Sequence, residues 1–294
     1  MLYINRETGI ESELSDATIA ALKRANEWHK FDETPLVLTG QGEGTCLYLE
    51  RNGIGDAVYA LPALSSYKGD ISCTHFLAPL YELLGHTTNR LKLHELTRQY
   101  KTIYNLSYWC TRHDQETKGE VYKTRFSQIA DLANLSLPYS FSWRDLFNFG
   151  EPRRDKIYSS LNSTSPWRSY KHDLPFEKMP TFHNVLDLVE TVYHARGIVA
   201  VDNGVLQLAL ALETPCVGLF GMTDEVTIVK QYERYVSGRV LILRSEVEEA
   251  CRPCSAQEAK GWQVNGKCKN EADCMRDLHP EHVTNKISEF FVLN

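Results

Sequence analysis

The chain has 294 residues, of which 43% are hydrophobic and 24% charged. These values are typical of a globular protein and exclude a disordered chain, and the length predicts two domains. A net charge of −6 provides no global field that would attract nucleic acid, and no apolar run is long enough for a membrane span. The polar, acidic N-terminus does not resemble a secretion signal, so we expect a cytoplasmic protein.

Segments typical of strands and helices alternate along the chain, which predicts an α/β protein with parallel sheets. In the first half we expect an amphipathic helix over residues 15–30, strands over residues 45–50, 71–78 and 102–109, and helices from about residue 56, over residues 79–85 and over residues 124–135. An aromatic, charged segment then ends this unit, and we place a domain boundary near Gly150.

The second half repeats the alternation. Strands are expected over residues 156–162, 197–203, 215–221 and 239–245, with helices over residues 182–196, 204–213 and 280–293. This pattern predicts two β/α halves, residues 1–150 and 151–294, with parallel sheets and a cleft between the halves. Ligands of such sheets bind beyond the carboxyl ends of the strands, which directs attention to residues 51–56, 162–168 and 202–204.

The first of these places carries an acidic residue at a strand-to-helix turn. The predicted strand is followed by Arg51, Asn52, Gly53 and Gly55, and then by Asp56. The glycines allow a sharp turn and a close approach to a ligand, while Asp56 lies where a carboxylate is stabilised by the helix dipole. Asp56 therefore either caps the helix or performs chemistry. Pro62 lies too deep for the first helical turn and predicts a distorted helix start.

A second glycine string, GQGEG at residues 40–44, precedes a strand rather than a helix. Its glycines cannot present a helix N-terminus to a pyrophosphate, so it fails the structural context of a dinucleotide-binding fingerprint. We expect a flexible loop there.

Polar residues also follow two predicted strands of the second half. Asp202, Asn203 and Gly204 follow one strand, and Thr223 and Asp224 follow the next. Amides of the helix that begins at Gly204 are expected to be free for an anionic group. The occurrence of both polar turns at neighbouring strand ends predicts a ligand site.

The loop after residue 162 supplies hydroxyl groups and a cation. These are Ser163, Thr164, Ser165 and Arg168. Hydroxyls and a guanidinium can neutralise a diphosphate.

Four cysteines near the C-terminus are Cys251, Cys254, Cys268 and Cys274. Their spacing allows a structural zinc site, reduced buried cysteines, or disulfides. The other four, Cys46, Cys73, Cys110 and Cys216, have apolar neighbours and are expected to be buried as small hydrophobic side chains.

Two motifs together resemble glycosyltransferase family 9, the heptosyltransferase-like glycosyltransferases. ERNGIGDAVYALPAL is similar to the opening motif of the family, VDNGVLQLALALETPCVGLFGMTDE is similar to its second motif, and the cysteine-containing tail resembles its ending. The resemblance implies a GT-B fold of two Rossmann-like domains whose sheets face each other across a cleft. It also implies an acceptor site mainly in the first domain, a nucleotide-sugar site in the second, and inverting sugar transfer without an obligatory catalytic metal.

Carried over by position, the resemblance makes Asp56 the general base. It places Asp202, Asn203, Gly204 and Gln207 in the donor motif and Thr223 and Asp224 in a loop near the donor. Gln207 stands where the family usually has His, Asn203 where it has Ser or Thr, and Arg168 is our substitute for the usual diphosphate-binding Lys. These departures leave both UDP-sugars and ADP-sugars as donors.

The acceptor class stays open at this point. Glycans or lipid-linked lipopolysaccharide precursors fit the family, with contact at the inner membrane surface. A phage-type enzyme that glycosylates hydroxymethylated bases in DNA, in a host cytoplasm, is an alternative; its basic and aromatic candidates are Arg51, Lys68, Trp109, Arg112 and Trp143. A non-catalytic nucleotide-sugar-binding or interaction module of the same fold is a third interpretation.

Overall fold

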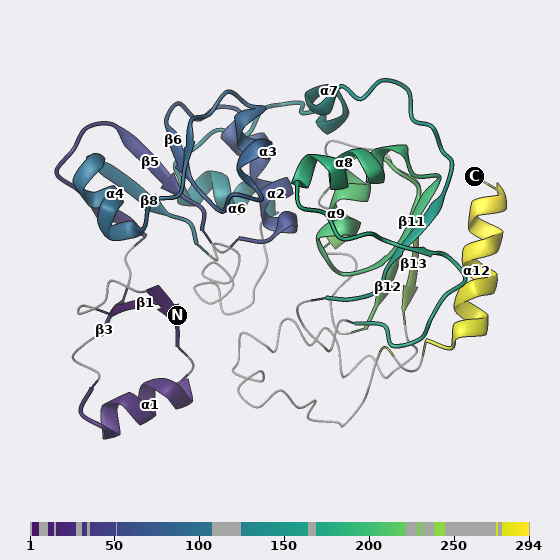
Figure 1. Ribbon diagram of the computed structural model, residues 1–294, viewed down its shortest axis with the longest axis horizontal. Coiled ribbons are helices and arrows are strands. Elements are labelled where there is room, and N and C mark those ends of the chain that lie inside the picture. Colours follow the sequence, from purple (N-terminus) through teal and green to yellow (C-terminus); the bar gives the residue numbers. More distant parts are fainter. Residues whose placement is uncertain are drawn as a thin grey trace.

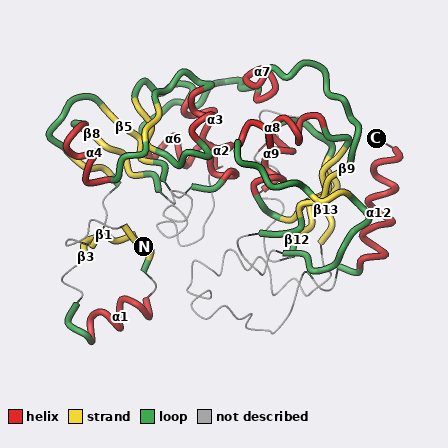
Figure 2. The backbone as a smooth tube through the Cα atoms, in the orientation of Figure 1, coloured by secondary structure: helices red, strands yellow, loops and turns green. Residues whose placement is uncertain are grey.

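The computed structural model describes residues 2–5, 11–14, 16–27, 31–33, 36–50, 52–107, 125–163, 169–221, 228–229, 232, 238–244, 275 and 278–293. Within these ranges the chain forms one small and two larger sheets (Figure 1). Figure 2 shows that most of the helices lie around and between the two larger sheets. The predicted α/β class is confirmed.

The small sheet was not expected from the sequence. Strands β1 (Leu2–Asn5), β2 (Glu11–Glu13) and β3 (Phe31–Glu33) pair antiparallel in the order β2-β1-β3. The expected amphipathic helix, α1 (Asp16–Arg24), lies between β2 and β3 in the chain.

The first larger sheet has the order β4-β8-β5-β6-β7. Its strands are β4 (Val37–Thr39), β5 (Thr45–Tyr48), β6 (Asp70–Ser72), β7 (Thr88–Asn89) and β8 (Thr102–Asn105). All neighbours are parallel except β4 and β8, which run antiparallel. The predicted strand over residues 71–78 is too long, because the amides of Leu77 and Ala78 donate to the carbonyl of Thr74 and form a turn.

Helices cover both faces of this sheet. They are α2 (Ile54–Leu64), α3 (Ala78–Glu82), α4 (Leu93–Gln99) and α6 (Arg125–Leu132). Alternate side chains of a strand point to opposite faces. Cys46 therefore packs with Leu96 of α4, whereas Leu47 joins the core formed by α2, α3 and α6.

The second larger sheet is entirely parallel, in the order β10-β9-β11-β12-β13. Its strands are β9 (Ile157–Ser160), β10 (Glu177–Lys178), β11 (Gly197–Val201), β12 (Cys216–Phe220) and β13 (Val240–Arg244). Helices α8 (Val185–His194) and α9 (Gly204–Ala211) pack on one face, and α12 (Pro280–Leu293) packs on the other. The short helix α7 (Trp143–Phe147) precedes this sheet in the chain, and Gly150 lies between α7 and β9. The domain boundary near Gly150 stays a prediction.

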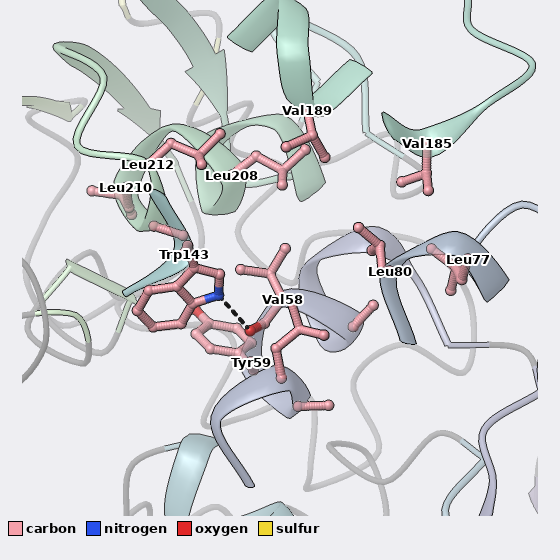
Figure 3. Close-up of a cluster of buried hydrophobic side chains, with 14 of the residues drawn as sticks. Val58, Tyr59, Leu77, Leu80, Trp143, Val185, Val189, Leu208, Leu210 and Leu212 are labelled. Atoms are coloured by element: carbon pink, nitrogen blue, oxygen red, sulfur yellow. Dashed lines mark hydrogen bonds between the residues drawn. The ribbon is translucent and has the colours of Figure 1, made fainter. Parts of the chain in front are cut away.

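The main hydrophobic core joins the two halves of the chain. Figure 3 shows Val58 and Tyr59 of α2, Leu80 of α3 and Val189 of α8 pointing into one cluster with Leu208 of α9. Helices α2 and α9 lie against each other at its centre. The start of α2 is thereby held against the second half of the chain by apolar packing.

Pro62 does not distort the start of α2, contrary to expectation. It lies inside the helix, where it cannot donate a backbone hydrogen bond to the carbonyl of Val58. The indole Nε1 of Trp143 instead donates to the Val58 oxygen at 3.3 Å (Figure 3). Trp143 is fully buried, so this residue is part of the core rather than an aromatic wall of a nucleic-acid groove.

The GQGEG segment is a loop, as predicted, but it is fixed in place. The amides of Gly40, Gln41 and Glu43 donate to backbone carbonyls of residues 101, 97 and 99. A Cβ added at Gly42 would lie 1.9 Å from the Gln99 oxygen. Glycine is needed here because the loop packs directly on the end of α4.

Candidate functional site

In the first larger sheet, the order in which the chain adds parallel strands reverses between β5 and β8. The chain runs outward from β5 to β6 and β7, and then returns to the other side of β5. Sheets of this kind bind ligands beyond the carboxyl ends of the strands at such a switch point. Asn52, which follows β5, donates from Nδ2 to the Leu106 carbonyl, which follows β8, at 3.3 Å. Asn52 thus bridges the switch point.

The second larger sheet has a switch point of the same kind between β9 and β11, because β10 lies on one side of β9 and β11 on the other. Asn203, beyond the end of β11, donates from Nδ2 to the carbonyl and the hydroxyl of Ser160, both at 3.1 Å, and to the carbonyl of Asn162 at 2.9 Å. An asparagine side chain therefore bridges the switch point of each sheet.

Asn203 is also the N-cap of α9. Its Oδ1 accepts from the amides of Val205 at 3.0 Å and Leu206 at 3.2 Å. Our expectation that these helix amides are free for an anion is therefore wrong, because the N-cap side chain engages two of them. The positive end of the helix dipole still favours an anion at this helix start.

Asp56 lies at the third position of α2, and Gly53 is the N-cap. Its Oδ2 accepts from the Gly53 amide at 2.9 Å, in the arrangement of a capping box. The carboxylate is half-buried. Asp56 thus does serve as a helix cap, and the same bond holds its carboxylate in a fixed orientation at the switch point of the first sheet.

The starts of α2 and α9 are in direct contact through two glycines. A Cβ added at Gly204 would lie 2.8 Å from the Ile54 Cβ and 3.3 Å from the Gly55 nitrogen, and one added at Gly55 would lie 3.2 Å from the Gln207 Cγ. Any larger residue at Gly204 would separate the helices. Because Gly55 precedes Asp56 directly and Gly204 is two residues after Asp202, this contact brings the two acidic turns together.

Buried hydrogen bonds extend inward from this contact. The hydroxyl of Tyr59 in α2 donates to Gln207 Oε1 in α9 at 2.6 Å, and Gln207 Nε2 donates to Asp202 Oδ1 at 3.5 Å. Only 8% of Asp202 and 3% of Gln207 is exposed. Gln207, which replaces the His of the resembled motif, therefore orients Asp202 and couples it to the first half of the chain.

Three buried hydroxyl groups around the site were missed from the sequence. Those of Tyr81, Ser107 and Tyr232 have no hydrogen-bond partner among the described residues. Burial raises the pKa of Tyr81 well above its usual value, with smaller contributions from the charges of Cys73 and Asp56. Burial likewise raises the pKa of Tyr232, and Tyr59 and Asp202 add to it. No sequence signal marks these hydroxyls, because each residue is one of many aromatic or small polar residues.

The remaining predicted residues divide into two groups. Ser163 is described, and its amide donates to the Ser169 hydroxyl at 3.0 Å, beyond the end of β9. The others lie outside the described residues: Arg51, Arg168, Thr223, Asp224, Cys251, Cys254, Cys268 and Cys274, as well as Thr164, Ser165, Trp109, Cys110 and Arg112. Their assignments stay predictions.

Three of the scattered cysteines are buried, as expected. Cys46, Cys73 and Cys216 are at most 1% exposed and form no disulfide. Burial raises the pKa of each thiol to about 12. They are inert components of the core.

None of the helices in the described ranges combines the length and hydrophobicity that a membrane span requires. The amphipathic helix α12 instead buries Val283, Ile287 and Phe291 against the second larger sheet.

Comparison with known proteins agrees with this architecture. Residues 183–261 match the model of glycosyltransferase family 9 (heptosyltransferase), a segment that includes α8, β11, α9 and β12. The dodecameric iron-containing heptosyltransferase TibC from enterotoxigenic E. coli, solved in complex with ADP-D-β-D-heptose, superposes with a TM-score of 0.53 at 11% identity, over 87% of this chain and 78% of that chain. E. coli heptosyltransferase WaaC with ADP gives a TM-score of 0.48 at 12% identity, over 84% and 100% of the two chains. No curated protein matches the chain in sequence.

The likeness to TibC shows a shared GT-B fold, and the family model matches the segment that carries the second acidic turn. The predicted resemblance is thereby confirmed for the segment that holds the second motif. The chain therefore has the fold of the heptosyltransferase TibC, and its residues 183–261 are similar to glycosyltransferase family 9.

Proposed function

We propose that this glycosyltransferase moves a sugar from a nucleotide-diphosphate sugar to an acceptor hydroxyl by a single displacement that inverts the anomeric configuration. The observation that carries the proposal is the glycine contact between α2 and α9, which holds the turn of Asp56 against the turn of Asp202. Each turn lies at the switch point of its sheet, where a ligand is expected.

Asp56 acts as the general base in this proposal. Its carboxylate accepts the proton of the acceptor hydroxyl while the acceptor oxygen forms a bond to the anomeric carbon. The bond from the anomeric carbon to the diphosphate oxygen breaks, and the nucleoside diphosphate leaves. The capping bond from the Gly53 amide supports this role, because it fixes the carboxylate without burying it completely.

Asp202 contacts the donor, and the start of α9 directs its positive dipole end toward the leaving diphosphate. Asn203 holds this helix start against Ser160, so it positions the donor turn rather than binding the anion through the helix amides. Arg168 and Ser163 supply the remaining neutralisation in the proposal.

The comparisons support a proposal for the donor and acceptor classes. The match to a heptosyltransferase model and the ADP-heptose bound to TibC favour an ADP-linked heptose, with a UDP-sugar as the alternative donor. A glycan or lipopolysaccharide-type acceptor fits the same family.

Donor binding is tested by thermal shift against ADP-heptose and against UDP-, GDP- and CMP-sugars, since a ligand of the folded state raises the melting temperature. We expect a rise with one donor class, and a weakened affinity in Asp202→Ala measured by titration calorimetry. Asp187→Ala, at an exposed position of α8, is the matched control and should bind normally. An unchanged affinity in Asp202→Ala removes Asp202 from the donor site.

The reaction itself is tested by NMR of the product with the donor so identified. Inversion at the anomeric carbon is expected, and a product with retained configuration refutes the single displacement. A donor that binds without transfer or hydrolysis across a panel of acceptors refutes the enzymatic proposal and favours a binding module.

A further inference from the structure

A pocket of about 420 Å³ lies at the amino ends of the strands in the second larger sheet, at the opposite edge from Asp202. Its lining residues are Arg154, Arg196, Glu213, Pro215, Gly238, Arg239, Phe291 and Val292. Arg196 directly precedes β11, Arg239 directly precedes β13, and Arg154 shortly precedes β9. Because these strands are parallel, their amino ends bring the three arginines to one edge.

The guanidinium groups of Arg154 and Arg196 are anchored by backbone carbonyls. Arg154 Nη1 donates to the Ala195 carbonyl at 3.1 Å, and Arg196 Nη2 donates to the Phe291 carbonyl at 3.2 Å. A guanidinium has five N–H donors, so each retains donors for a ligand. The anchors hold both groups at the pocket and reduce the entropy lost when a ligand binds.

The pocket carries an excess of positive charge. Among the described residues that line it, Glu213 is acidic and three are arginines. In the described part of the chain, neither Arg154 nor Arg196 forms an ion pair. Burial, followed by the charge of Arg144, lowers the pKa of Arg154, although a guanidinium stays protonated at physiological pH. A bound anion would compensate these charges.

The other wall of the pocket is apolar. Pro215, Phe291 and Val292 contribute it, and Val292 is 79% exposed, which is unusual for a large hydrophobic side chain. The volume exceeds that of a phosphate group and lies within the range of small-molecule sites. A ligand with an anionic group and an attached carbon skeleton would fit both walls.

We propose that this pocket is a second anion site that binds a phosphate ester or diphosphate, separate from the donor site. Arginine is suited to this chemistry because its planar donors pair with two phosphate oxygens at once. The apolar wall takes the group that the phosphate carries, which is either the carbon skeleton of a soluble phosphate ester or the glycerol and acyl region of an anionic lipid.

The first experiment titrates inorganic pyrophosphate into the full chain, both in the wild type and in Asp202→Ala, whose donor site is impaired, so that binding at the second site is distinguished from binding at the donor site. We expect binding to the wild type, and an affinity about ten-fold weaker in Arg196→Gln and in Arg154→Gln, since each removes a charge-assisted pair. Arg153→Gln is the matched control, because Arg153 is exposed, next to Arg154, and absent from the pocket. Thermal melting without ligand confirms that the variants are folded.

The second experiment distinguishes the source of the phosphate. Sedimentation with phosphatidylcholine vesicles, with and without phosphatidic acid, assigns a lipid headgroup if binding requires phosphatidic acid and is lost in Arg196→Gln. If Arg196→Gln weakens pyrophosphate binding but vesicle binding does not depend on phosphatidic acid, the ligand is a soluble phosphate. Binding that is equal in Arg196→Gln and Arg153→Gln, or absent in both experiments, overturns the proposal.

If no sugar nucleotide binds to the wild type while the pyrophosphate response persists in Asp202→Ala, the proposed transfer reaction is wrong but the second anion site stands. Loss of the pyrophosphate response in Arg196→Gln with normal sugar transfer establishes the site independently of catalysis.

Discussion

The hydroxyl of Tyr59 and the side-chain carbonyl of Gln207 form a buried hydrogen bond of 2.6 Å between residues that are 148 positions apart. It joins α2 to α9 and therefore joins the helix that carries Asp56 to the helix that follows Asp202. Tyr59→Phe should lower the free energy of unfolding by about 1–3 kcal/mol, because Gln207 Oε1 loses its donor inside the core. Urea denaturation measures this change.

A double-mutant cycle with Gln207→Leu tests whether the effect is due to the pair. The two changes together should cost less than the sum of the single changes, since the second removes the group that the first leaves unsatisfied. Tyr139→Phe is the control, because Tyr139 is 96% exposed and its hydroxyl is hydrated in both states. Strict additivity would show that the bond contributes nothing specific.

Asp56→Asn should reduce the rate of sugar transfer by about 10²–10⁴-fold with little change in donor affinity, because the amide cannot accept the acceptor proton but can still accept from the Gly53 amide. Initial rates and calorimetric titration of the donor measure the two quantities. Glu95→Gln is a matched control, since Glu95 makes the same capping contact to the Lys92 amide in α4. If folded Asp56→Asn turns over at nearly the wild-type rate, Asp56 is not the general base and serves only as a helix cap.

Gly204→Ala should destabilise the protein by about 1–3 kcal/mol, because its methyl group would overlap Ile54. Donor affinity and transfer rate should both fall as the two acidic turns separate. Gly53→Ala, whose Cβ would be 3.6 Å from Asp56 Oδ2 and is therefore in ordinary contact, should retain both. Equal behaviour of the two variants in thermal melting would contradict the importance of the helix contact.

Trp143→Phe should destabilise the chain by about 1–3 kcal/mol, because the Val58 carbonyl loses the indole donor that replaces the missing amide of Pro62. Adding Pro62→Ala to this variant should recover part of the loss, since alanine supplies a backbone N–H to the same oxygen. Chemical denaturation of the single and double variants checks the recovery. No recovery would mean that Trp143 acts only through its buried area.

Cys46, Cys73 and Cys216 should resist alkylation in the folded protein at pH 8 and react once it is unfolded, because burial raises each thiol pKa from 9.0 to about 12. Peptide-resolved mass spectrometry after iodoacetamide treatment measures this protection. Between pH 9 and about 12 the unfolded thiols ionise before the folded ones, so these groups should lower stability as the pH rises. Rapid labelling of the folded chain at these positions would show that the core opens locally.

Most of the elements could be predicted from the sequence because their patterns are local. The fully buried strands β11 and β12 are short apolar runs, and each is followed in the sequence by polar residues. The same logic located Asp56 and Asp202, since acidic residues after a strand and before a helix mark the carboxyl edge of a parallel sheet. The small antiparallel sheet and strands β4, β7 and β10 were not predicted. Strands β7 and β10 have two residues each, which is too short to show a periodic pattern.

The sequence by itself determined the fold class, the family resemblance and the two acidic turns, because strand-to-helix connections are encoded within about ten residues. Tertiary structure alone decided what each residue does there. In the folded chain, Asn203 accepts from the amides at the start of α9. Trp143 donates to the Val58 carbonyl, which Pro62 leaves without a helical donor. Tertiary structure also placed Gly204 against Ile54 and gathered the arginines at the far edge of the second sheet. These contacts join residues that are far apart in the sequence. Residue types and their spacing predict local elements but not which distant residues come into contact.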